Sequence, residues 1–263
     1  MRARVIFSVE NVGASIPFHH QFLLSRIVKE MIVLDPVYQG FKSYSFSGVK
    51  GQTKVGRDGL QVLSNKITIV FSSHSKEFLH FLIHKIFTYK KIEIATLRVR
   101  PDSVEIEEIP TFTENKYKYL CLSPVVFSNP KVNMLDMKKF ILPTSDEFSD
   151  LVFESTMTAM ERSGMYDTQQ LSSFYKFQIL PDMDYLDKIK QEEKKIARIY
   201  NVYMSDVKYE VRGYTIPFTL FAEPQVHQFI FNEGLGALTN EGFGMLDMPV
   251  SEFKRGSKPF LFR

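Results

Sequence analysis

The sequence predicts an α+β fold in which two successive halves share one order of elements: strand, helix, strand, strand, helix, strand. Three observations predict it along the 263 residues. Apolar residues alternate where strands are expected, recur every three or four positions where helices are expected, and follow this order twice. The order is typical of tandem ferredoxin-like (RRM-like, βαββαβ) domains with antiparallel sheets. With the boundary near Pro110, we expect an N-terminal domain over residues 1–112 and a C-terminal domain over 113–263.

The elements of the first half follow from periodicity and turn residues. The expected strands cover residues 2–10, 43–49, 59–73 and 91–108. The expected helices cover residues 17–31 and 75–87. Pro17 stands at an allowed early position of the first helix. The second helix is amphipathic, with Phe78, Leu82 and Ile86 on one face.

The second half repeats the order after the boundary. Its expected strands cover residues 117–127 and 174–180, a long β-rich segment at 197–221, and residues 243–248. Its expected helices cover residues 146–162 and 224–232. Thr144 and Glu147 have the spacing of a capping box, which would start the first of these helices.

Composition describes an ordinary soluble globular protein, with 44% hydrophobic and 24% charged residues. The net charge of +3 is too small to indicate nucleic acid by itself, so local clustering must carry that argument. The N-terminus has no apolar signal region, and no apolar run is long enough to span a bilayer. We therefore expect a cytoplasmic protein.

Cysteine and histidine usage gives no sign of a metal or another cofactor. The single cysteine, Cys121, excludes an intramolecular disulfide and a cysteine-rich zinc site, and its strand context favours a small buried hydrophobe. His80 and His84 are four residues apart but lie opposite the apolar face of their helix without a nearby third ligand. A solvated helix face is the preferred interpretation, and we expect no metal and no cofactor.

A glycine-rich run near the C-terminus is the strongest functional signal. Gly234, Gly236, Gly242 and Gly244 fall within eleven residues, and Phe243 stands between the last two. Glycine permits positive φ and close backbone approach, so this run predicts an exposed strip of N–H groups that can contact phosphates. No Lys-Ser/Thr pair follows, which separates the run from the common nucleotide-binding loops. A structural turn is the alternative, and the spacing favours the functional interpretation.

This run resembles the C-terminal signature of the CRISPR-associated repeat-processing endoribonucleases, the Cas6 family of the RAMP superfamily: a G-x-G pair followed by G-F-G. Three further segments resemble the family in the same order along the chain. They are residues 16–21, 120–125 and 211–224. The resemblance covers nearly the whole chain. The C-terminal run is fairly specific, whereas the other three segments are persuasive only in order.

The resemblance implies a protein that binds CRISPR repeat RNA in a groove between two domains and along the glycine-rich loop. It also implies metal-independent cleavage, in which a 2′-hydroxyl attacks to leave a 2′,3′-cyclic phosphate and a 5′-hydroxyl. Two alternatives remain open: an inactive homologue that binds repeat RNA, and a structural subunit of an RNA-guided interference complex. The corresponding partners are the repeat RNA, other Cas proteins and, in a homodimer, a second copy of the chain.

The candidate catalytic residues lie on and after the first helix. At about 100° per residue, His20 falls within the apolar stripe, which favours a core histidine. His19 projects the other way, in line with Arg26 and near Lys29, so that this polar face could present a base and cations to RNA. A plain solvent-facing helix is an equally weighted alternative.

The sequence departs from the family at this site. The resemblance implies a histidine in the loop after the helix, a tyrosine within the helix and a lysine before the next strand. Residues 33–41 contain no histidine, Lys29 stands where the tyrosine would be, and Lys42 matches the lysine. Tyr38 is a weak base at neutral pH. Either His19, Arg26, Lys29 and Lys42 form a cationic site with a poor base, or the chain has lost the chemistry.

Basic residues elsewhere could hold the RNA backbone. Lys50, Lys54 and Arg57 lie in a glycine-containing hairpin that suits phosphates, although a solvated turn is weighed equally. The C-terminal tail interleaves Lys258 and Arg263 with Phe260 and Phe262, a pattern that can stack bases. Packing of these rings on the body of the protein is the preferred interpretation for the tail.

Overall fold

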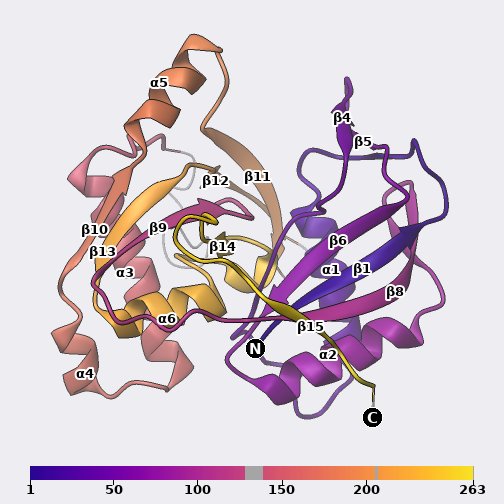
Figure 1. Ribbon diagram of the computed structural model, residues 1–263, viewed down its shortest axis with the longest axis horizontal. Helices are drawn as coiled ribbons and strands as arrows, with labels where there is room; N and C mark the ends of the chain where they lie inside the picture. Colours follow the sequence, from indigo (N-terminus) through magenta and orange to yellow (C-terminus); the bar gives the residue numbers. More distant parts are fainter. Residues whose placement is uncertain (128–138, 205–206, 263) are drawn as a thin grey trace. The chain divides into compact units, whose positions relative to one another are not determined.

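The protein is seen in a computed structural model that describes residues 1–127, 139–204 and 207–262. The chain forms two compact units (Figure 1). The first contains residues 1–109, 240–242 and 255–263, and the second contains residues 110–239 and 243–254. Each unit combines helices with antiparallel strands, so the predicted α+β class is confirmed. The division into domains at residue 112 stays a prediction. Two C-terminal segments, residues 240–242 and 255–263, belong to the first unit.

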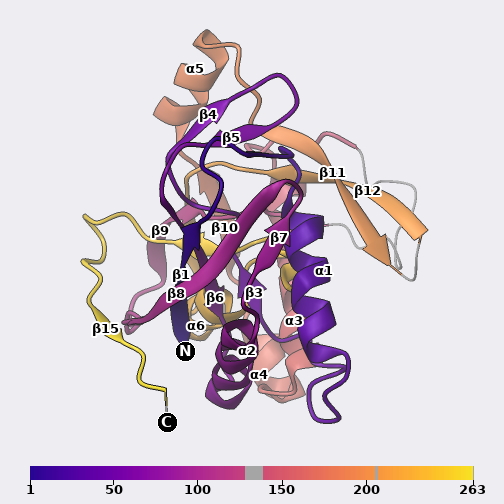
Figure 2. The same ribbon diagram turned by 90° about the vertical axis from the view of Figure 1, so that its right-hand side faces the viewer.

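The first unit is built on an antiparallel sheet with the strand order β15-β8-β1-β6-β3, and β7 also pairs with β8. Its strands are β1 (Arg2–Val9), β3 (Ser45–Phe46), β6 (Lys66–Ser72), β7 (Ile92–Ile94), β8 (Leu97–Glu107) and β15 (Ser257–Pro259). The central strand β1 pairs Val5 with Ile69 on one side and with Val104 on the other. β15 runs beside the C-terminal end of β8 (Figures 1 and 2). This edge strand was not predicted, because it has three residues and no alternating apolar pattern.

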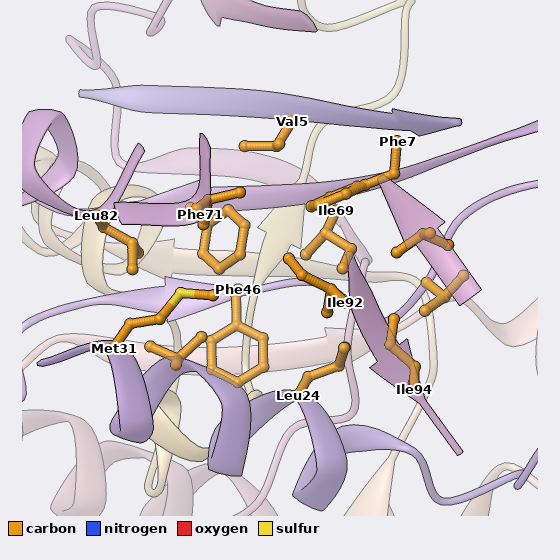
Figure 3. Close-up of a cluster of buried hydrophobic side chains, with 14 of the residues drawn as sticks. Val5, Phe7, Leu24, Met31, Phe46, Ile69, Phe71, Leu82, Ile92 and Ile94 are labelled. Atoms are coloured by element: carbon orange, nitrogen blue, oxygen red, sulfur yellow. The ribbon is translucent and has the colours of Figure 1, made fainter. Parts of the chain in front are cut away.

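Two helices pack against this sheet, α1 (Gln21–Ile32) and α2 (Lys76–Thr88). The predicted apolar face of α2 is confirmed, since Phe78, Leu82 and Ile86 are all buried. Ser75 caps α2 by accepting a hydrogen bond from the Phe78 N–H. Figure 3 shows Leu24 and Met31 of α1 pointing towards the strands of the sheet. One continuous apolar core therefore joins the helices to the sheet and fixes the orientation of α1.

A smaller three-stranded sheet, β2-β5-β4, adds to the first unit. It contains β2 (Ser15–Ile16), β4 (Thr53–Val55) and β5 (Leu60–Val62). All three residues of β4 are exposed, which leaves the β4–β5 turn at the surface. A hairpin is thus present, but it joins β4 to β5 instead of the expected strands 43–49 and 59–73, and Lys50 lies just before its first strand.

The second unit contains an antiparallel sheet with the order β10-β13-β9-β14. Its strands are β9 (Lys116–Cys121), β10 (Phe177–Pro181), β13 (Phe218–Ala222) and β14 (Leu246–Asp247). The helices of this unit are α3 (Asp146–Ser163), α4 (Thr168–Ser173), α5 (Met183–Gln191) and α6 (Pro224–Glu233). A separate hairpin joins β11 (Ala197–Met204) to β12 (Val207–Tyr214). The long β-rich segment of the sequence is therefore three strands in two sheets.

Several predicted boundaries are wrong for local physical reasons. Pro17 lies before the turn at residues 18–20 that precedes α1, and the N-cap of that helix is His20. The cap of α3 is Ser145, whose hydroxyl accepts from the Phe148 N–H, so the predicted Thr144–Glu147 box is not formed. The two-residue strand β14 is much shorter than the predicted 243–248, because the positive φ of Gly244 prevents extension there. In the parts of the chain that the structure describes, no helix has the length and apolar character needed to cross a membrane.

Candidate active site

The candidate site is organised around a carboxylate that the sequence did not single out. Glu241, in the glycine-rich run, is 7% exposed and belongs to the first unit. Lys29 of α1 binds both of its oxygens, with Nζ 2.5 Å from Oε1 and 2.7 Å from Oε2. The Ser25 hydroxyl, one turn earlier on the same helix, donates to Oε2 at 2.5 Å. Two positions separated by four residues thus place their polar atoms on one side of α1, where they hold Glu241.

The backbone around Glu241 fixes the position of its side chain. Residues Thr239–Glu241 form a 3₁₀ turn, and Gly242 follows with φ of 87°. A Cβ atom at Gly242 would lie 2.5 Å from Cε2 of the buried Phe46 ring, so the turn can come this close to β3 only with glycine at that position. The buried Tyr44 phenol is near the same carboxylate. Burial, and then the negative charge of Glu241, raise the pKa of Tyr44 above its usual value.

His20 has the core role that the helix geometry predicts. Its ring is 5% exposed, its Nδ1 donates to the Pro17 carbonyl at 3.1 Å, and its Nε2 accepts from the Val49 N–H at 3.0 Å. These two bonds require the neutral ring with the proton on Nδ1. Burial lowers the pKa of His20 to about 4, the Pro17 carbonyl opposes that change, and the charge of Lys50 adds to it. His20 therefore positions the segment after β3 rather than accepting a proton from a substrate.

The other predicted catalytic residues lie in the same unit, in different local environments. His19 is half-buried in the turn before α1. Arg26 is exposed on α1 and pairs with Glu30 at 3.7 Å. Lys42 is exposed in the segment that leads to β3. Tyr38 packs against the rings of Phe78 and Phe81. The structure thus brings Lys29 together with Glu241, whereas Arg26 has a partner of its own on the same helix.

The glycine-rich run uses its N–H groups inside the protein. Gly234 donates to the Ile230 carbonyl, Gly236 to the Thr156 hydroxyl at 3.2 Å, and Gly244 to the Pro124 carbonyl at 2.7 Å. All of these contacts lie in the second unit. The expected exposed strip of N–H groups is therefore wrong at these three positions.

Phe243 lies in the same unit and is 1% exposed, with its ring edge-on to Tyr200. The phenylalanine between the two glycines is thus part of the core of the second unit. A contact of Phe243 or of the four glycines with RNA stays a prediction.

The predicted basic hairpin is at the surface. Lys54 lies on β4 and Arg57 in the β4–β5 turn, and both are exposed. Lys50 is half-buried, and its backbone exchanges two hydrogen bonds with Thr68 of β6. The hairpin therefore offers the cations Lys54 and Arg57 to solvent. The segment just before it is anchored to the main sheet through the backbone of Lys50.

The C-terminal tail packs its aromatic rings on the protein, which was the preferred interpretation of its sequence. Phe260 contacts the rings of His80 and His84 edge-on, and Phe262 contacts Phe87 of the same helix. The predicted solvated face of α2 is thus partly covered by the tail. Arg263 lies outside the described residues.

The remaining metal-site and thiol candidates have ordinary structural surroundings. Within residues 1–127, 139–204 and 207–262, no group of three or more His, Cys, Asp or Glu side chains could hold a metal ion. Cys121 is half-buried and donates to the Ile216 carbonyl at 3.2 Å, so the expected full burial is wrong.

Comparison with known proteins identifies the class of this chain. The sequence model of the family described as CRISPR associated protein Cas6, C-terminal, matches residues 102–248, which is more than half of the chain. No curated protein sequence matches it. The chain belongs to the Cas6 family, as the resemblance of its glycine-rich run implied.

Solved structures share the fold at low sequence identity. A CRISPR associated protein Cas6 superposes with a TM-score of 0.70 at 17% identity, covering 95% of this chain and 99% of that one. A Cas6-related gene product from Pyrococcus furiosus gives a TM-score of 0.75 at 18% identity, covering 95% and 98%. A RAMP protein described as binding different RNA substrates gives 0.75 at 15% identity, covering 95% and 99%. At these identities the matches show the fold alone.

Proposed function

We propose that this chain binds CRISPR repeat RNA and cleaves it without a metal ion. The observation that carries the proposal is family membership through residues 102–248, and the cations Arg26 and Lys29 of α1 support it. A phosphate backbone is bound by Lys and Arg side chains through charge, largely without regard to base sequence. The RNA-binding description of the similar RAMP protein is in keeping with this function.

The proposed architecture is a pair of ferredoxin-like domains. In the first unit the sheet order is β8-β1-β6-β3. Counted along the chain, these are the fourth, first, third and second strands of the set. In the second unit, β9, β10, β13 and β14 follow the same order. A helix follows the first and third strand of each set, which is the βαββαβ arrangement. This shared topology supports the tandem interpretation of the sequence.

The proposed chemistry is an in-line attack of a 2′-oxygen on the adjacent phosphorus. The P–O bond to the 5′-oxygen breaks, the 2′-hydroxyl proton passes to a base, and the leaving oxygen receives a proton. Lys29 and Lys42 are assigned to the charge of the pentavalent phosphorane, because an ammonium donates hydrogen bonds and carries positive charge. His19 is assigned the proton transfer. Arg26 is assigned to phosphate binding beside them.

The RNA backbone is assigned to the basic hairpin and the glycine-rich run. Lys54 and Arg57 supply cations in the hairpin, and Lys50 supplies one just before its first strand. Gly234, Gly236, Gly242, Phe243 and Gly244 are assigned to the RNA backbone in the run, and Gly242 also allows the close approach to Phe46 that places Glu241 against α1. The run therefore has a second function beside the proposed RNA contact, which is to position an acidic side chain.

Incubation of the purified protein with repeat RNA in EDTA tests the proposed function. We expect product that ends in a 2′,3′-cyclic phosphate, with a 5′-hydroxyl on the other fragment. The variants His19→Ala, Lys29→Ala and Lys42→Ala should each lower the cleavage rate by about tenfold or more while RNA affinity is largely retained. Unchanged rates in all three would discard the site assignment and leave the family intact.

An RNA-binding homologue without catalysis is the second candidate function. Two observations favour it: residues 33–41 hold no histidine, and the charge of Lys29 is balanced by Glu241. Tight binding of repeat RNA without product in EDTA or in magnesium would select this function. Weak binding of isolated repeat, together with co-purification of other Cas proteins, would select a structural subunit of an interference complex. Sedimentation of the purified chain tests the homodimer.

A further inference from the structure

The contact between Glu241 and α1 has the features of a functional ion pair. Surface ion pairs between mobile side chains contribute little, because solvent screens them and side-chain freedom is lost. Glu241 is different: it is 7% exposed, and both of its oxygens are used by Lys29. Ser25, itself 2% exposed, donates to the same carboxylate. Such charge-assisted, two-point contacts fix a geometry as well as an energy.

Lys29 remains able to contact a ligand while Glu241 holds it. An ammonium has three N–H donors, and Glu241 takes two of them. The Lys29 side chain is 40% exposed, so solvent reaches part of it. A phosphate oxygen that approaches from the solvent side would therefore meet a lysine whose head group is already oriented.

We propose that Glu241 is a positioning residue, which orients the Lys29 ammonium for an RNA phosphate and competes with that phosphate for its charge. The inference rests on the proposed function. It assigns a role to a residue of the glycine-rich run beyond the glycines themselves. It also makes two effects of Glu241 opposite in sign: the carboxylate aids the reaction by holding Lys29, and it opposes binding by repelling the polyanion.

The variant Glu241→Gln separates these effects because it removes the charge and keeps the shape. Cleavage of repeat RNA at saturating protein should become about tenfold slower, since a neutral amide holds the ammonium more loosely. RNA affinity should rise by about two- to threefold, since one negative charge beside the backbone is gone. The slope of log affinity against log salt concentration should become more negative, by about the amount expected for one additional phosphate contact, because Lys29 is freed to bind phosphate.

Glu30→Gln is the matched control. Glu30 lies on the same helix and pairs with Arg26, but its side chain is 64% exposed. This variant also removes one negative charge but leaves the contact of Lys29 with Glu241 in place. The cleavage rate at saturating protein should therefore stay within about twofold of wild type. In a Lys29→Ala background, Glu241→Gln should change the rate by less than about twofold, because the group it positions is absent. Thermal unfolding of each variant shows whether it is folded.

The outcomes distinguish this inference from the proposed function. Two results overturn the inference alone when wild type cleaves RNA. One is an unchanged cleavage rate in Glu241→Gln. The other is additivity, in which Lys29→Ala and Glu241→Gln lower the rate independently of each other. A fall in both rate and affinity assigns Glu241 a purely structural role and also overturns it. If wild type binds repeat RNA without cutting it, catalysis is overturned, and the salt slope of Glu241→Gln, measured with and without Lys29→Ala, still decides the competition for Lys29. Absence of RNA binding by wild type overturns both.

Discussion

His20 illustrates at the residue scale how position on a helix determines chemistry. Two adjacent histidines have identical side chains, yet His20 is buried with both ring nitrogens bonded, and His19 is half-buried in the preceding turn. Because a positive charge is unfavourable in the buried site, folding keeps His20 neutral. Helical spacing predicted the burial of His20, although both histidines precede the first residue of α1, Gln21.

The low pKa of His20 makes stability depend on pH in a defined window. The folded-state pKa of about 4 lies below the ordinary value of 6.5, so between these values the unfolded chain binds more protons. The free energy of unfolding should therefore fall as pH is lowered from 7 to 5, by about 2 kcal/mol from this residue. Urea unfolding at both pH values measures the fall. His20→Gln should show a smaller fall than wild type, and an equal fall would contradict the assignment.

Glu241 marks the limit of what the sequence could predict at this scale. Lys29 was selected from its place near the polar face of the first helix, and Lys42 from the lysine that the family resemblance implies. The partner of Lys29 is 212 residues away in the sequence, and Glu241 by itself is one acid among 30. No local pattern distinguishes it, apart from its place directly before Gly242 in a run already selected. Ser25 was missed for the same reason, since serine on a helix has no preferred role.

The glycine-rich run shows at the element scale how positive φ and close backbone approach serve the fold itself. Gly244 has φ of 68°, and a Cβ atom there would collide with the Leu235 carbonyl. The same residue donates to the Pro124 carbonyl. Sequence spacing predicted the positive φ and the close approach correctly, but it assigned the approaching group to a ligand when it is the protein's own backbone.

Gly244→Ala should therefore destabilise the protein more than a glycine change without the collision. We expect a loss of about 2–4 kcal/mol in the free energy of unfolding, from left-handed strain plus the backbone clash. Gly164→Ala is the matched control, because Gly164 has φ of 67° at the end of α3 and nothing within 4 Å of a Cβ atom there. That control should lose only about 1 kcal/mol. Equal losses measured by urea unfolding would remove the collision from the explanation.

Elements with long periodic patterns were predictable and short ones were not. Helices α2, α3 and α6 begin and end within one residue of the predicted bounds. The six-residue α4 and the nine-residue α5 were missed, because neither has a buried residue to give an apolar period. Their start signals were present: Asp167 forms a capping box with Gln170, and Asp182 accepts from the Tyr185 N–H. Caps identify such helices better than hydrophobicity does.

At the scale of the whole molecule, the first unit is discontinuous in sequence. It consists of residues 1–109 together with residues 240–242 and 255–263. The last segment contributes β15 to the sheet edge and Arg255, whose Nη1 lies 3.0 Å from the buried Glu107 carboxylate. The boundary that the sequence places near residue 110, from the proline and the repeated order of elements, stays a prediction. The return of the chain to the first unit was not predicted, because it depends on pairing between β8 and a three-residue strand.

Removal of residues 256–263 tests the contribution of this tail. The shortened chain loses the pairing of β15 with β8 and the contacts of Phe260 with α2. We expect a loss of about 1–3 kcal/mol in the free energy of unfolding. The Glu108 amide, which donates to the Gly256 carbonyl, should exchange its hydrogen faster. Leu261→Ala, at a side chain that is 74% exposed, is the control and should change neither measurement.

The late position of β15 in the chain also has a consequence during protein synthesis. While the chain is being made, β8 can pair with β1 long before residues 257–259 leave the ribosome. Its C-terminal half then presents unpaired N–H and C=O groups, which can template pairing with another nascent chain. Residues 257–259 thus convert an aggregation-prone edge into a paired one, and chaperones would be needed most in the interval before these residues emerge.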